Sequence, residues 1–102
     1  MSLKDDKIGD SGVNYLSSAL IKLTNLAVLT LDLNNNNLIG DSGVNYLSTA
    51  LIKLTNLSCL TLELSNNNLI GDSSVNFLST ALIRLFNLSS LTLSLNSNSI
   101  GD

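Results

Sequence analysis

The sequence predicts an α/β fold in which helix–strand units stack side by side and their strands form a parallel sheet. The chain has 102 residues and contains two 31-residue blocks, residues 8–38 and 39–69, which differ at only five positions. A related third block follows at residues 70–100, and the Gly-Asp pairs that mark the blocks recur after 31, 31 and 30 residues. In each block, apolar residues with helical spacing precede a segment in which leucine alternates with other residues. One such unit cannot bury its apolar face alone, so the units must share a core.

Residues 10–23 are expected to form the first helix. Asp10 or Ser11 is suited to cap its first backbone N–H groups, because both side chains are short acceptors. Gly12 is expected to be an ordinary first-turn residue, since the third block has Ser74 there and a position that accepts serine does not require a positive φ. The apolar residues recur on one helical face: Val13, Leu16, Ala19, Leu20 and Leu23. The polar residues are assigned to the opposite face: Asn14, Ser17, Ser18 and Lys22.

Residues 26–33 are expected to form the first strand, because leucine alternates with threonine and aspartate from Leu29 to Leu33. The same alternation recurs in the other two blocks. It predicts three buried leucine columns: Leu29, Leu60 and Leu91; Leu31, Leu62 and Leu93; Leu33, Leu64 and Leu95. Two helix columns are expected to face them: Leu16, Leu47 and Leu78; Leu20, Leu51 and Leu82. A vestigial fourth strand is expected around Leu3.

The two ends of the chain overlap in pattern. Ser2–Asp10 aligns with Ser94–Asp102, so residues 1–7 are interpreted as the tail of a preceding repeat. We therefore expect a single domain, residues 1–102, in which that tail precedes repeats 8–38, 39–69 and 70–100. The overlap favours a segment excised or engineered from a longer periodic array. A natural small protein that grew by duplication is the alternative.

The repeated residues also suggest a family. One repeat reads Leu29-x-Leu31-x-Leu33-x-x-Asn36-x-Leu38, followed by Gly40-Asp41, Leu47, Ala50-Leu51 and Leu57. This pattern resembles leucine-rich repeats of the ribonuclease-inhibitor type, and it covers essentially the whole chain because it recurs three times. The repeats of 30–31 residues are longer than the usual length of about 20–29. The resemblance implies a short horseshoe-shaped solenoid with parallel strands on the concave face, helices on the convex face, and use as a binding surface.

The composition excludes most kinds of catalytic and metal site. The chain has no His and one Cys, Cys59, so it cannot assemble a Ser–His or Cys–His pair or a zinc site with about four N and S ligands. We expect no enzyme activity, no metal and no cofactor. Five Lys and Arg against eight Asp and Glu give a net charge of −3, which disfavours nucleic acid and anionic membranes as partners. The polar first residues and short apolar runs predict neither a signal peptide nor a membrane span, so a cytoplasmic location is expected.

Asparagine occurs in two columns. One column is expected to be a structural asparagine ladder, in which buried amides bind backbone groups of the turns: Asn36, Asn67 and Asn98. Asn37 or Asn68 could replace the first two, so the register stays open. Asn25, Asn56 and Asn87 precede the strands and are expected to act similarly. Binding of an amide-rich ligand is the alternative use of these columns.

The outward positions of the three expected strands form a candidate binding face. Its residues are Val28, Thr30, Asp32, Cys59, Thr61, Glu63, Ser90, Thr92 and Ser94. Two of the five differences between the first two blocks, at positions 28 and 32, lie on this face and a third, at position 27, adjoins it. That variation fits a recognition surface, and drift of exposed positions is the alternative. Asp32 and Glu63 would stand side by side, which favours a basic partner or a weakly held hard cation. Cys59 is expected to be exposed.

These observations predict a non-enzymatic module that offers a protein-binding surface. Natural repeat arrays close their ends with atypical, polar repeats, and no such repeat is evident in this sequence. Self-association through uncovered apolar ends is therefore expected, as a homodimer or a larger assembly. A purely structural, self-assembling segment is the alternative function.

Overall fold

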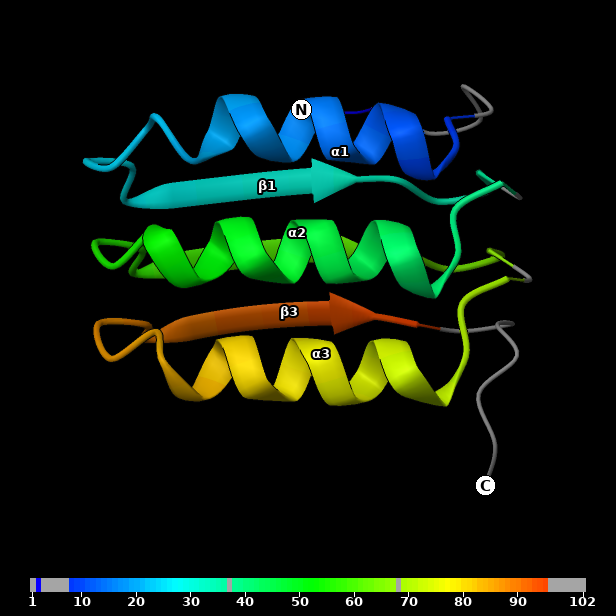
Figure 1. Cartoon of the computed structure of the whole chain (residues 1–102). Helices are drawn as coiled ribbons and strands as arrows, with labels where there is room; N and C mark the ends of the chain where they lie inside the picture. The colour runs from blue at the N-terminus through cyan, green and yellow to red at the C-terminus, as the bar shows by residue number, and fades with distance from the viewer. Residues whose placement is uncertain (1, 3–7, 37, 68, 96–102) are drawn as a thin grey trace.

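The computed structural model describes residues 2, 8–36, 38–67 and 69–95, and Figure 1 shows how they are arranged. Within these residues the elements are α1 (Asp10–Leu20), β1 (Val28–Asp32), α2 (Asp41–Lys53), β2 (Cys59–Glu63), α3 (Asp72–Ile83) and β3 (Ser90–Ser94). We call each helix together with the strand that follows it a unit, so that α1 and β1 form unit 1. The predicted α/β class is confirmed.

The three strands form one parallel sheet in the order β1-β2-β3. Leu29 pairs with Leu60, and Leu60 pairs with Leu91, so the register repeats at the spacing of the sequence blocks. Equivalent residues of the units therefore lie in straight columns across the sheet. Ser2 forms one isolated parallel bridge with Asp32, on the side of β1 where a vestigial strand was expected. Leu3 itself lies outside the described residues.

The helices form a second layer against the sheet, with α2 between α1 and α3 (Figure 1). They run side by side in one direction, opposite to that of the strands (Figure 1). Parallel strands need a long crossover between them, and a helix supplies it here in each unit. α1 ends at Leu20, three residues before the expected end at Leu23.

The core lies between the two layers and is almost entirely aliphatic. The leucines of β1 and β2 point into it and are nearly or fully buried, as predicted. From the helices, Leu47, Leu51 and Leu78 are equally buried, while Leu16 and Leu82 are only half-buried. Ile39 and Ile70, which precede α2 and α3, are completely buried and close the edge of the core.

The prediction that every member of the leucine columns is buried is wrong for β3. Leu91 is 45% exposed, whereas its neighbour Leu60 is 1% exposed. Leu93 is likewise exposed, and Leu95 is half-buried. The cause is position in the stack, because β2 is covered on both sides by strands and no described strand lies beyond β3.

The prediction that Ser17 faces solvent is also wrong. Ser17 and its counterpart Ser48 are each only 3% exposed, and neither hydroxyl has a hydrogen-bond partner among the described residues. The equivalent Ser79, on the last helix, is exposed. This position is therefore buried in α1 and α2, where another helix follows, and exposed in α3, which no described helix follows.

The starts of α2 and α3 are capped by the unit before them, and the start of α1 has no side-chain cap among the described residues, which corrects the expectation that Asp10 or Ser11 caps its own helix. Asp10 Oδ1 accepts hydrogen bonds from the backbone N–H groups of Gly40 and Gly43, at 2.8 and 2.9 Å. Asp41 repeats this arrangement one unit later, with N–H donors at Gly71 (2.9 Å) and Ser74 (3.2 Å). The glycine N-caps have no side chain to do this, so the carboxylate satisfies orphan donors of the next helix.

The same contact revises the expectation for the first-turn glycines. No described glycine has a positive φ, as expected. A Cβ at Gly43, however, would lie only 2.5 Å from Asp10 Oδ1, so this position is tightly packed against the preceding unit. Ser74 occupies it in unit 3 and donates its hydroxyl to Asp41 Oδ1. That bond is the largest of the effects that hold the pKa of Asp41 below its ordinary value, and the Gly71 N–H is the next.

Candidate interaction surfaces

The outward strand face contains the nine side chains singled out in the sequence. The strand register places them in three columns: Val28, Cys59 and Ser90; Thr30, Thr61 and Thr92; Asp32, Glu63 and Ser94. The first two outward residues of β1 and of β3 are exposed, whereas Asp32 and Ser94 at the strand ends are half-buried. All three outward residues of β2 are half-buried, because strands flank them on both sides. The face is therefore a flat row of mostly short side chains. None of its residues lines the described pocket, which residues 22–26 form.

Asp32 and Glu63 occupy paired positions on neighbouring strands. Asp32 Oδ1 also accepts the backbone N–H of Asn34 at 3.0 Å, which holds this carboxylate at the end of its strand. Like charges at directly paired positions repel each other, so a cationic group beside them would be favourable. Among the described residues, no group of three or more His, Cys, Asp or Glu side chains could hold a metal ion.

Cys59 lies in the centre of the first column, between Val28 and Ser90. It is a free thiol and is half-buried, which corrects the expectation that it is exposed. Its two neighbouring strands reduce its accessibility in the same way as they do for Thr61 and Glu63.

The first asparagine column lies in the turns after the strands. Asn36 and Asn67 are both completely buried, so these two residues occupy inward positions. Asn36 Nδ2 donates to the backbone carbonyl of Leu33 at 2.9 Å, and its Oδ1 accepts the N–H of Ile8 at 2.8 Å. Asn67 Nδ2 donates to the carbonyls of Leu64 (2.8 Å) and Leu33 (3.2 Å). These bonds indicate a structural role; Asn98, Asn37 and Asn68 lie outside the described residues.

The second asparagine column links consecutive units. Asn56 Nδ2 donates to the backbone carbonyl of Thr24, and Asn87 Nδ2 donates to that of Thr55, both at 3.0 Å. Asn25 is the equivalent residue of unit 1 and is exposed. It lies in an open hollow of about 370 Å³ lined by residues 22–26.

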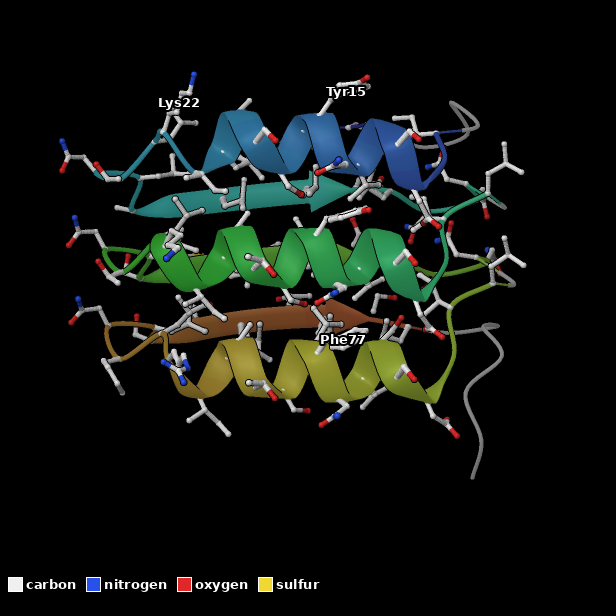
Figure 2. All side chains as sticks on the ribbon, viewed as in Figure 1. Tyr15, Lys22 and Phe77 are labelled. Atoms are coloured by element: carbon white, nitrogen blue, oxygen red, sulfur yellow. The ribbon has the colours of Figure 1, made fainter. Side chains whose placement is uncertain are left out.

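Apolar side chains are exposed on the outer side of unit 1, which we call the N-face (Tyr15, Ala19 and Leu23). Tyr15 is 77% exposed, and Figure 2 shows it projecting from α1 away from the other helices. Phe77, at the same position of α3, projects toward α2 and is half-buried (Figure 2). Leu23 is 49% exposed, whereas the equivalent Leu54 is completely buried. These positions are thus less exposed where a preceding unit covers them, although Tyr46 of unit 2 is still 40% exposed.

A second apolar surface lies on the outer side of unit 3, which we call the C-face (Ile83, Phe86, Leu91 and Leu93). All four residues are exposed, and Phe86 replaces a threonine that is present in the other two units. The leucines at these strand positions are buried wherever a following unit is present. The strand leucines of the C-face and Leu23 of the N-face therefore match the two sides of the interface that joins consecutive units, whereas Thr24 and Thr55, at the position of Phe86, stay exposed in it.

Sequence reasoning located the strand face and both asparagine columns but missed two features. It assigned Asp10 or Ser11 to the cap of its own helix, and it did not recognise Leu23 as part of an uncovered face. A signal for the first was present, because the Gly-Asp pair recurs at the start of every block. A side chain that binds the next unit must recur once per repeat, just as a residue that caps its own helix must, so the regular recurrence fits both roles.

No protein family, curated protein or solved structure was found to match this chain. None of the described helices combines the length and the apolar character needed to cross a membrane.

Proposed function

We propose that the chain is a non-enzymatic leucine-rich repeat module, of the ribonuclease-inhibitor-like type, whose outward strand face binds a protein partner in the cytoplasm. In this proposal the three units form a short horseshoe, with the sheet on its concave side. The supporting observation is the strand register, which aligns nine outward side chains in three columns while the alternate leucines of β1 and β2 stay in the core.

The chemistry of the face favours an extended polar or basic peptide segment as its partner. The central column offers three threonine hydroxyls, and the third offers two carboxylates and a serine. A lysine or arginine of the partner would relieve the repulsion between Asp32 and Glu63. The variation between the near-identical units 1 and 2 at positions 28 and 32 alters this face and leaves the core unchanged.

A display library of random peptides tests this proposal. We expect the full chain to enrich peptides rich in lysine or arginine, and Thr61→Arg to abolish their binding. The matched control Asn45→Arg adds the same charge at an exposed position of α2 and should leave binding intact. Enriched peptides that bind Thr61→Arg as well as the wild type would contradict the strand face as the site.

Structural self-assembly is the second candidate function. It is supported by the apolar N-face and C-face, since large exposed apolar surfaces in a small protein mark interaction sites. Light scattering over a range of dilutions tests it: we expect the mean mass to exceed 10.8 kDa at high concentration and to fall on dilution. Thr92→Lys, which places a charge on the exposed strand β3, should lower that mass without unfolding the units.

A further inference from the structure

We infer that copies of this chain join head to tail, with the C-face of one copy seated on the N-face of the next in the register of the internal unit interfaces. This inference rests on the proposed self-association and assigns it a geometry. It gives β3 of one copy a parallel neighbour in β1 of the next, with Leu91 beside Leu29 and Ser94 beside Asp32.

The two internal interfaces share a set of equivalent hydrogen bonds. The backbone N–H of Leu33 donates to the carbonyl of Glu63 at 2.8 Å, and the N–H of Leu64 donates to that of Ser94 at the same distance. The asparagine-to-turn bond and the aspartate cap each occur once per interface, with nearly identical lengths. One interface geometry is therefore used twice by nearly the same residues.

Residues from both sides of that interface are exposed at the two ends of the described chain. Unit 1 presents Asn25, which matches Asn56 and Asn87, so its amide would meet the backbone carbonyl of Phe86 in the other copy. The hydroxyl bond of Ser58 and Ser89 has no counterpart there, because unit 1 has Ala27 at this position.

The shape of the N-face also fits a preceding unit. The hollow lined by residues 22–26 lies at the turn that a preceding unit would cover, and the same turn in unit 2 contains the fully buried Leu54 and Leu57. In the internal interfaces the backbone carbonyls of Thr24 and Thr55 contact this turn of the following unit, so the backbone of Phe86 in one copy would lie beside the hollow of another.

Charge also favours this pairing. The internal interface of units 1 and 2 places Asp32 beside Glu63, two like charges. The intermolecular interface would place Asp32 beside the uncharged Ser94, so it avoids that repulsion. One contact must be exchanged: the isolated bridge between Ser2 and Asp32 occupies the place that Ser94 of the other copy would take.

Because the two faces differ, the interface is heterologous and leaves a free face at each end of the pair. The assembly is then open-ended. This differs from a two-fold dimer, in which the same face of both copies would meet.

Two variants, each of which blocks one face, test whether the C-face of one copy binds the N-face of the next. Ile83→Lys with Phe86→Lys blocks the C-face at residues that are 75% and 87% exposed, and Ala19→Lys with Leu23→Lys blocks the N-face. We expect each variant to be monomeric alone, because each lacks one half of the interface. An equimolar mixture should form a 1:1 dimer of twice 10.8 kDa that grows no further. Circular dichroism checks that both variants retain their helices.

The possible results separate the inference from the proposal on which it rests. If one blocked variant still dimerises alone, the interface is two-fold, and head-to-tail joining is overturned while self-association stands. If the wild type stays monomeric at millimolar concentration, both are overturned, and peptide binding by the strand face is unaffected.

A single amide gives a finer test. Asn25→Ala should weaken association about three- to ten-fold, the effect of one lost hydrogen bond. The matched control Asn87→Ala removes the equivalent bond inside the molecule, so it should lower the melting temperature and leave association unchanged. Equal effects of both variants on association would contradict the register.

Discussion

At the scale of single residues, Asp41 has the clearest role beyond its own unit. Its carboxylate accepts two backbone N–H groups at the start of α3 and the hydroxyl of Ser74. Charged acceptors at a helix N-terminus are stabilising because they satisfy orphan donors and oppose the positive end of the dipole. The residue therefore fastens unit 3 to unit 2 as well as capping a helix.

Asp41→Ala should lower the free energy of unfolding by about 1–2 kcal/mol, the usual cost of losing a helix cap. Urea denaturation at neutral pH measures this loss. Asp10→Ala, which removes the equivalent cap from the start of α2, is the matched comparison and should cost a similar amount. Unchanged stability in both variants would contradict the role of the cap between units.

The lowered pKa of Asp41 predicts a pH dependence. Since its folded pKa lies below the unfolded value of about 3.9, the unfolded chain binds more protons in acid. The contribution of this carboxylate is thus fully present above about pH 5 and is lost as pH falls through the folded pKa. Wild type should lose more stability between pH 6 and pH 3 than Asp41→Asn. Parallel losses in the two proteins would mean that Asp41 does not titrate differently on unfolding.

The buried hydroxyl of Ser48 gives a prediction of opposite sign. Burying a hydroxyl without a partner costs free energy, so Ser48→Ala should leave stability unchanged or raise it by up to about 1 kcal/mol. Ser79→Ala makes the same change at an exposed position and controls for the higher helix propensity of alanine. Thermal melts of both variants give the difference. Destabilisation by Ser48→Ala alone would show that the hydroxyl is bonded.

At the scale of elements, the pairing of the strands was predictable from the sequence, whereas the side chains that cap the helices were not. A fixed repeat length and a leucine alternation leave one register that keeps all leucine columns inward, and the strands adopt it. The burial of Ser17 and Ser48 was not predictable from helical spacing. It depends on how closely α1, α2 and α3 approach, and small side chains permit that approach without being apolar.

The strands themselves provide a matched pair of substitutions. Leu62→Ala should cost about 2–5 kcal/mol because it leaves a cavity in a fully covered position. Leu93→Ala, directly beside it in the sheet, should cost clearly less, since that side chain is already exposed. Thermal denaturation tests the pair, and the loss at Leu62 is a large part of the stability of a domain this small. Equal costs would mean that β3 is covered in solution.

At the scale of the whole molecule, the strand face was identified from sequence because period-2 alternation separates inward from outward residues. The two end faces were only partly predictable. Uncovered aliphatic ends were expected, yet Leu91 and Leu93 were also placed in buried columns, and both statements cannot hold for the last strand. In the structure Leu91 and Leu93 are exposed, because the core of each unit is completed by the unit that follows it.

Stability should consequently depend on protein concentration. If folded copies associate and unfolded chains do not, mass action raises the melting temperature as concentration rises. We expect a rise of several degrees between micromolar and millimolar chain. The Ile83→Lys, Phe86→Lys variant should show no such rise, because its C-face is blocked. A melting temperature that is independent of concentration in the wild type would contradict association of the native state.

The described hydrogen bonds between units connect residues 29 to 34 positions apart, and this uniform separation governs how the chain folds. Loops of that size close quickly, so folding should start at any pair of neighbouring units and spread to the third. The near-identity of units 1 and 2 also makes their strands interchangeable, and only the short connections keep them in order. A strand tethered this closely has an effective concentration in the millimolar range. Refolding should therefore be fast and faithful in dilute solution, whereas exchange of strands between chains becomes competitive only when the protein itself reaches that concentration.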